Sequence, residues 1–340
     1  MVTQLANPIT LEGKLAAVES EKRVLAERYN YKKRKANRFW DPFQIAREGV
    51  TADHFNYSDN LKVMVPGFFE VESLEARYTA EGFLTSGSSQ VGRDIYEIWG
   101  GEERAHYLVL LLGLIDSDWY TREEIDQFQD VAIRGSWSFE SQTGLKPTII
   151  RGGVFTVGQE DNTGRNYYQL MRLAWREQGS PVDGNGHPIY RGWSYIFYLL
   201  WRDESAHLAN FLLNLLVDMK YFPSETFQAI FDVLKKYRMP KITLSDPEAF
   251  VKAIMESGVS SLRVPISVIK DARNKFGLED NTAVLRAIKE WNKLPVDSLI
   301  RLTEKVAKGV DRNPHVEDGA VNIYELNTDG TFTLVSAKAV

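Results

Sequence analysis

Two Glu-x-x-His sets are the residues of this 340-residue chain whose types and spacing could bind a metal ion. Glu103 with His106 forms the first set, and Glu204 with His207 forms the second. Residues three apart share one face of a helix, so each set presents a carboxylate oxygen and an imidazole nitrogen to one point. This mixture of oxygen and nitrogen ligands suits iron or manganese. Taken alone, a single set of this kind is usually an ordinary surface pair.

Apolar surroundings favour metal binding over surface pairing for both sets. The stripe around the first set, at helical spacing, is Trp99, Glu103, His106, Leu110 and Leu114, and the stripe around the second is Phe197, Leu200, Glu204, His207, Phe211 and Leu215. A carboxylate inside such a stripe is expected to be buried, and a buried charge requires a partner or a metal. Of the five histidines in the chain, only these two have a glutamate three residues earlier.

Two further glutamates complete a recognisable ligand pattern. A di-metal carboxylate site between four helices takes a Glu-x-x-His set from each of two helices and one Glu from each of the other two. The segment 65–83 centres a helical stripe on Glu72, and the segment 153–171 centres one on Glu160. Taken separately, each is as well explained as a partly exposed helix residue. Together the four motifs alternate along the chain as Glu, Glu-x-x-His, Glu, Glu-x-x-His, which predicts a repeated helical hairpin.

The elements that position these residues are expected to be long helices. The predicted helices carrying the candidate ligands span 64–84, 89–115, 150–178 and 191–220. Further helices are predicted at 10–31, 121–142 and 223–237, with shorter ones beginning near 246 and 279. Two alternating runs around the turn 327–330 predict a β-hairpin. We therefore predict one all-α domain over 1–340, with a four-helix bundle at about 60–220, accessory helices at 221–310 and a hairpin at 321–335.

Composition excludes several kinds of chemistry and partner. The absence of cysteine excludes disulfides, thiolate metal sites and a cysteine nucleophile. A net charge of −5 argues against nucleic acid as a general partner. The N-terminus lacks the basic and apolar regions of a secretory signal, and no apolar run reaches the ~20 residues that span a bilayer. We expect a cytoplasmic protein that does not associate with membranes.

These motifs resemble those of the soluble acyl carrier protein desaturases (acyl-ACP desaturases), which are ferritin-like di-iron enzymes. The resemblance includes the segment 158–163 (Gly-Gln-Glu-Asp-Asn-Thr), the segment 203–207 (Asp-Glu-Ser-Ala-His) and the Trp-Asp-Pro sequence at 40–42. In the C-terminal part it is looser and involves Met-Pro at 239–240 and the segment 294–309. The resemblance implies a ferritin-like four-helix bundle with additional packing helices.

The resemblance also implies a function. A centre of two iron ions would use dioxygen to insert a cis double bond into an acyl chain carried on acyl carrier protein, in fatty acid biosynthesis. Glu72 and Glu160 would be terminal ligands, Glu103 and Glu204 would bridge the ions, and His106 and His207 would complete one ion each. A ferredoxin-like protein would donate electrons, and the chain would form a homodimer. Manganese stays an alternative, because the ligand set alone does not separate the two metals.

Three further residues have roles implied by the same resemblance. Thr163, one helical turn after Glu160, would place a hydroxyl beside the open face of the centre and deliver a proton during oxygen activation. The alternative is a helix threonine bonded to its own backbone. Asp203 is expected to contact a ligand histidine, His106, and Trp40 to contact Asp203, forming a route for electrons. Trp40 is alternatively an ordinary core aromatic residue.

One departure from the family pattern leaves the reaction open. Desaturases of this family usually carry a threonine immediately before the first ligand, and here the residue is Val71. The Gly/Pro-rich segment 179–192 and a short connection between Glu72 and Glu103 are further expected to reshape the substrate tunnel. The first alternative is a di-iron oxygenase, a hydroxylase or N-oxygenase of specialised metabolism. The second is a ferritin-like iron-binding or radical-storing protein, such as a ribonucleotide reductase small subunit.

Basic residues gather at 32–38 and at 235–241 in an otherwise acidic chain. Each cluster is either a solvated face or a docking site for an acidic partner such as acyl carrier protein. The length of the acyl chain, the position of the double bond and the choice between acyl carrier protein and coenzyme A do not follow from the sequence.

Overall fold

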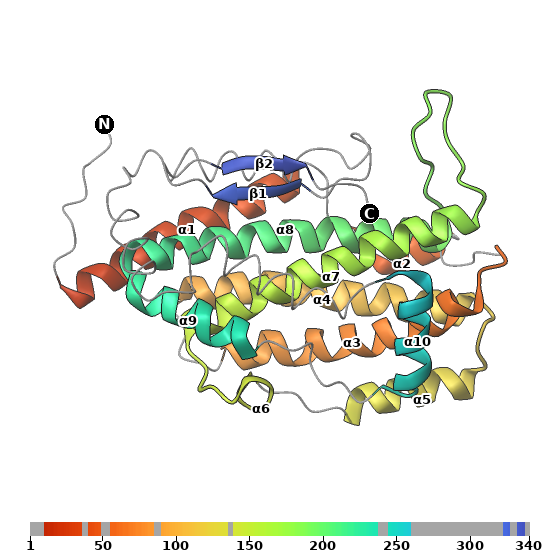
Figure 1. Ribbon diagram of the computed structural model, residues 1–340, viewed down its shortest axis with the longest axis horizontal. Helices are drawn as coiled ribbons and strands as arrows, with labels where there is room; N and C mark the ends of the chain where they lie inside the picture. Colours follow the sequence, from red (N-terminus) through yellow and green to blue (C-terminus); the bar gives the residue numbers. More distant parts are fainter. Residues whose placement is uncertain are drawn as a thin grey trace.

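A computed structural model describes residues 10–35, 40–48, 55–84, 90–134, 139–236, 244–259, 322–326 and 332–336. The described part is predominantly helical, which confirms the all-α prediction. Its longest buried elements are α3 (Asp59–Leu84), α4 (Gln90–Asp116), α7 (Ile149–Glu177) and α8 (Gly192–Tyr221). These four helices run side by side along the long axis of the molecule (Figure 1). Helix α3 packs on α4 and α7, and α8 packs on α7 and α4, so the four enclose a common interior.

The other helices cover this group from outside. They are α1 (Leu11–Lys35), α2 (Pro42–Arg47), α5 (Arg122–Arg134), α6 (Phe139–Thr143), α9 (Pro223–Lys236) and α10 (Pro247–Ser257). Helix α1 lies along α8 and also contacts α4, α2 packs on α4, and α10 crosses α3 (Figure 1). Near the C-terminus, β1 (Asn322–Leu326) and β2 (Phe332–Ser336) pair antiparallel with Asn322 opposite Ser336.

Helix α3 begins earlier than the predicted residue 64 and continues through a proline. The hydroxyl of Ser58 accepts a backbone N–H of the first turn at 3.3 Å, which caps the helix. Pro66 lacks the N–H that would bond the carbonyl of Lys62. That carbonyl instead accepts the hydroxyl hydrogen of Tyr120 at 2.9 Å. The proline therefore leaves no unsatisfied acceptor, and the helix reaches the site unbroken.

Two short elements differ from the sequence prediction. Within the span 121–142, predicted as a single helix, the structure gives α5, which ends at Arg134, and α6, which begins at Phe139, and residues 135–138 lie outside the described residues. Helix α2 was not predicted. The carboxylate of Asp41 caps it by accepting the Phe43 N–H at 2.9 Å, and Pro42 occupies its first turn.

The helices predicted to start at Pro223 and near residue 246 are confirmed as α9 and α10. Asp246 caps α10 by accepting the Ala249 N–H at 2.9 Å, and Gly258 ends the helix in the left-handed conformation with φ of 70°. The helix predicted near 279 and the family-like segments 239–240 and 294–309 lie outside the described residues. The side chains of both basic clusters are likewise outside the described set.

The interior between the four long helices is apolar around a polar centre. The largest fully buried side chains of the described residues are Trp193, Tyr167, Phe68, Phe69, Phe155, Phe197, Leu61, Met64, Leu110, Leu114 and Leu170. The hydrophobic effect of burying these side chains holds the helices together. No helix in the described ranges has the length and apolarity needed to cross a membrane.

The Gly/Pro-rich segment between α7 and α8 forms a projecting loop (Figure 1). Val182 bridges to Pro188, and the Asp183 carboxylate accepts the backbone N–H groups of Asn185 and His187. These contacts are internal to the loop. The loop is therefore held by its own contacts and connects the end of α7 to the start of α8.

Candidate metal centre

The six predicted ligands lie together in the interior between the four long helices. Helix α3 supplies Glu72, α4 supplies Glu103 and His106, α7 supplies Glu160, and α8 supplies Glu204 and His207. Each side chain sits at the centre of its helix and is at most 1% exposed. Four buried carboxylates so close together require compensating positive charge.

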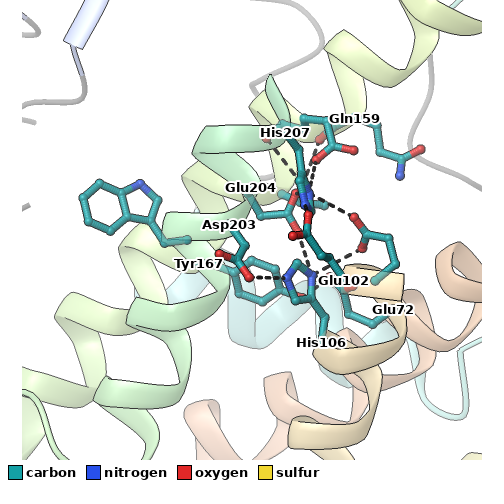
Figure 2. A network of polar contacts seen from close by, with 12 residues as sticks. Glu72, Glu102, His106, Gln159, Tyr167, Asp203, Glu204 and His207 are labelled. Atoms are coloured by element: carbon teal, nitrogen blue, oxygen red, sulfur yellow. Dashed lines mark hydrogen bonds and ion pairs between the residues drawn. The ribbon is translucent and has the colours of Figure 1, made fainter. Parts of the chain in front are cut away.

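His106 turns one ring nitrogen toward three of the carboxylates. Its Nδ1 lies 3.1 Å from a Glu204 oxygen, 3.3 Å from a Glu103 oxygen and 3.6 Å from a Glu72 oxygen. Figure 2 shows Glu72 and Asp203 approaching this ring from opposite sides. The ring is therefore oriented, with Nδ1 inside the carboxylate cluster.

His207 repeats this arrangement with a second set of carboxylates. Its Nδ1 lies 3.1 Å from Glu103 Oε1, 3.1 Å from Glu160 Oε2 and 3.8 Å from Glu204 Oε2. The centroids of the two imidazole rings are 5.7 Å apart. Both histidines therefore direct Nδ1 toward the two carboxylates of Glu103 and Glu204.

Two groups of four residues could each hold a metal ion. They are Glu72, Glu103, His106 and Glu204, and Glu103, Glu160, Glu204 and His207, with the ligand atoms of each group within 4.8 Å of one another. Glu103 and Glu204 belong to both groups. Among the described residues, both oxygens of Glu103, Oε2 of Glu72, Oε1 of Glu160, Oε1 of Glu204 and both nitrogens of His106 have no hydrogen-bond partner. Buried atoms of these types are normally paired, so their residues fit a metal site.

The crowded charges shift the pKa values of the cluster. Burial, together with the charges of Glu103 and Glu204, raises the pKa of Glu72 to about 7, although His106 opposes the shift. Burial and the charge of Glu204 raise the pKa of Glu160 well above its ordinary value. Without bound cations the cluster therefore retains protons that metal ions would displace.

Both histidines are more basic than usual. Burial alone would lower the pKa of His106, but the charge of Glu103 and contacts with Asp203 and Glu204 raise it well above 6.5. Burial opposes the same rise at His207, where the charge of Glu160 is the largest raising contribution. The carboxylates therefore outweigh burial at both rings.

Asp203 and Trp40 make the contacts that the sequence led us to expect. The indole Nε1 of Trp40 donates to Asp203 Oδ2 at 2.8 Å, and this oxygen lies 3.7 Å from His106 Nε2. The indole also stacks on the His106 ring, with centroids 6.2 Å apart and planes inclined by 5°. Trp40 is thus in contact with the site as well as packed against the apolar core.

Sequence reasoning missed two residues on the other side of the site. Glu102 Oε2 lies 2.7 Å from His207 Nε2 and accepts the hydroxyl hydrogen of Tyr29 at 2.9 Å. The internal repeat contained a signal for Glu102, because an acidic residue precedes the ligand glutamate in both sets, as Asp203 does in the second. Tyr29 had no such signal, since it comes from α1, far away in the chain.

Two hydroxyl groups contact the carboxylates directly. Tyr167 donates to Glu72 Oε1. The Thr163 hydroxyl lies 2.9 Å from Glu204 Oε2 and 3.1 Å from the backbone carbonyl oxygen of Gln159. The backbone bond considered for Thr163 is therefore present, and the hydroxyl also reaches the Glu204 carboxylate, a contact that was not predicted from the sequence.

Neighbouring residues are turned away from the centre. The Glu70 carboxylate is buried but accepts the backbone N–H of Ser245 at 3.1 Å, and Asp161 pairs with Arg165. Val71 is buried and supplies no hydroxyl. The helical stripes thus separated the glutamates that face the centre from those that do not.

No protein-family model matches the chain, and no curated protein matches it either.

Proposed function

We propose that the protein is an acyl-ACP desaturase with a ferritin-like four-helix core and a di-iron centre. The observation that carries this proposal is the pair of four-residue groups that share Glu103 and Glu204. Four carboxylates and two imidazoles match the number and types of ligand that two divalent iron ions need in such a core. Ligand sets of this kind leave coordination positions open, which is typical of catalytic sites.

The six ligands have distinct tasks in this proposal. Glu72 with His106 would hold one ion, Glu160 with His207 would hold the other, and Glu103 and Glu204 would bridge them. The bound iron would supply the oxidising chemistry that no side chain provides, which is the removal of two hydrogens from an unactivated acyl chain by dioxygen.

The surrounding residues would orient the ligands and move protons. Tyr167 donates to Glu72 and fixes the direction of that carboxylate. Thr163 would direct its hydroxyl hydrogen bond either to the Gln159 carbonyl or to Glu204 Oε2, which places a hydroxyl that can relay a proton beside this carboxylate. The enclosing apolar side chains exclude water from the reaction.

The contacts from Trp40 through Asp203 to His106 support a route for electrons from a ferredoxin-like donor. Asp203 accepts from the indole and lies against the histidine nitrogen that faces away from the carboxylates. Such a carboxylate also fixes the orientation of the imidazole. The proposed homodimer rests on the family resemblance.

Val71 favours one alternative, a di-iron oxygenase that adds an oxygen atom instead of removing hydrogens. The side chain before the first ligand is buried and apolar, where desaturases of the family usually carry a hydroxyl. Both reactions would use the same six ligands, so the product distinguishes them.

The test is mass spectrometry of the fatty acids released after the iron-loaded protein reacts with stearoyl- and palmitoyl-ACP, ferredoxin, ferredoxin reductase and NADPH. A product lighter by two hydrogen atoms, lost in Glu204→Ala and retained in the exposed control Glu123→Ala, supports desaturation. A product heavier by one oxygen atom selects the oxygenase. If both ions are bound and neither substrate changes, stearoyl-ACP and palmitoyl-ACP are substrates of neither a desaturase nor an oxygenase activity of this protein, which contradicts both proposals for these two acyl chains.

A further inference from the structure

His207 takes part in a chain of contacts that the proposed reaction does not use. Its Nε2 lies 2.7 Å from Glu102 Oε2, and the same oxygen accepts the hydroxyl hydrogen of Tyr29 at 2.9 Å. His207 is 1% exposed and Glu102 is 9% exposed, so water does not easily replace either contact. The chain links a candidate ligand to α1, a helix that supplies no candidate ligand.

The two nitrogens of His207 face different surroundings. Nδ1 lies 3.1 Å from both Glu103 and Glu160, inside the candidate metal site. An imidazole binds a metal through an unprotonated nitrogen, so Nδ1 must be the one without hydrogen in the loaded protein. The hydrogen then belongs on Nε2, where Glu102 is placed to accept it. The position of Glu102 thus selects the tautomer that binds metal.

A matching arrangement exists at the other histidine. Asp203 lies against His106 Nε2 and accepts from the Trp40 indole, as Glu102 lies against His207 Nε2 and accepts from the Tyr29 hydroxyl. The two acids cross between helices, since the acid on α4 faces the histidine on α8 and the acid on α8 faces the histidine on α4. Each histidine therefore has its own acid and its own aromatic donor.

We propose that Glu102 and Tyr29 are positioning residues for the metal ion held by His207 and Glu160. The inference rests on the proposed metal centre and adds two residues to it. Glu102 holds the His207 ring in one tautomer and orientation, and Tyr29 holds the Glu102 carboxylate. Removing an outer contact of this kind lowers metal affinity by roughly 10- to 100-fold. The loss is confined to one of the two ions.

A purely structural role makes a different prediction. Tyr29 and Glu102 join α1 to α4, and the Tyr29 ring also lines a small pocket with Ala26, Trp99 and Phe211. If these contacts only attach α1, their loss lowers the melting temperature and reduces the affinity for both metal ions equally. Tyr29→Phe keeps the ring in the pocket and removes the hydroxyl, so it separates the two roles.

The test is titration of metal-free protein with Co²⁺, followed by the visible absorption of the bound ion and by calorimetry. Glu72→Ala and Glu160→Ala serve as backgrounds in which one site has lost its terminal glutamate. In the Glu72→Ala background, Glu102→Ala is expected to weaken Co²⁺ binding roughly 10- to 100-fold, with Glu102→Gln and Tyr29→Phe in between. In the Glu160→Ala background the same changes leave Co²⁺ affinity unchanged. Trp40→Phe, the matched control, gives the opposite pattern.

Equal losses in both backgrounds, or unchanged affinity with a lowered melting temperature, would overturn the positioning role while leaving the centre in place. Failure of the unsubstituted protein to bind Co²⁺ would instead remove the proposed centre, and the positioning role with it. Far-ultraviolet circular dichroism of each metal-free variant shows that it is folded before titration.

Discussion

The stability of the metal-free protein favours the protonated form of Glu72, whereas metal binding requires the carboxylate. Burial raises its pKa to about 7, above the ordinary value of 4.5 that it regains on unfolding. A folded-state pKa above the unfolded one means that the group favours folding at low pH. Its contribution is lost as pH rises from about 4.5 through 7.

Glu72→Gln, which stays neutral, is therefore expected to make the metal-free protein less sensitive to pH. Between pH 5 and pH 8 the unsubstituted protein should lose up to about 3 kcal/mol more stability than the variant. Calorimetric melting in the presence of a chelator measures this difference. With metal bound, the unsubstituted protein should be the more stable of the two, because glutamine is a poorer ligand than carboxylate. If the stability of the two proteins changes with pH in the same way, burial does not raise the pKa of Glu72 as described.

Proton release should accompany metal binding. The raised pKa values of His106, His207 and Glu160 favour the protonated forms of these groups in the metal-free state. Metal ions require the deprotonated forms, so loading at pH 7 is expected to release about two protons or more per chain. Titration calorimetry in phosphate and in Tris, which differ in ionisation enthalpy, counts them. Apparent affinity should rise with pH, and equal heats in both buffers would refute the prediction.

At the residue scale, helical spacing together with the ligand pattern of di-metal four-helix sites identified the six side chains that the structure brings together. The helical repeat fixes which residues share a face, so burial and proximity within one helix follow from the sequence. Tyr29 could not be predicted in this way. Its contact with Glu102 depends on where α1 lies across α8 and α4, and no periodicity encodes that position.

At the scale of helices, the close approach of α4 and α8 depends on a glycine. A Cβ atom on Gly113 would lie 2.6 Å from the fully buried ring of Trp193. Gly113→Ala is therefore expected to destabilise the protein by about 1–3 kcal/mol, despite the better helix propensity of alanine. Gly153→Ala on α7 is the control, because its Cβ would meet nothing within 4 Å. Thermal melting of the two variants measures the effect, and a matching gain at both positions would show that Trp193 can move.

The helix boundaries show which local signals the sequence carries. The starts of α9 and α10 were predictable from Pro223 and the Asp-Pro pair at 246–247, since proline and a capping aspartate act locally. The start of α3 was placed too late, because the role of Pro66 is decided by a distant hydroxyl, that of Tyr120. Tertiary contacts thus decide the helix boundaries that local sequence propensity does not determine.

At the scale of the whole molecule, a buried ion pair attaches α1 to the four-helix core. Lys22 Nζ lies 2.7 Å from a carboxylate oxygen of Asp218 on α8, and both residues are buried. Asp218→Asn leaves the ammonium without its charge partner, which costs about 3–5 kcal/mol for pairs of this kind. Hydrogen exchange along α1 should therefore speed up.

The double variant Lys22→Met/Asp218→Leu provides the control for this prediction. Replacing both charges with apolar side chains removes the unpaired ammonium, so slow exchange along α1 should return. Unchanged exchange in Asp218→Asn would show that α1 is held by its other contacts. Because Tyr29 is on the same helix, the test also reports on the attachment of the residue that contacts Glu102.

The most direct test of the account is anomalous diffraction from crystals grown with Fe²⁺ under anaerobic conditions. We predict two iron peaks in the interior between α3, α4, α7 and α8, one beside Glu72 and His106 and one beside Glu160 and His207. Glu103 and Glu204 should lie between them. Iron peaks only at the surface, or none in crystals of protein incubated with excess Fe²⁺, would contradict the metal centre and every function proposed from it.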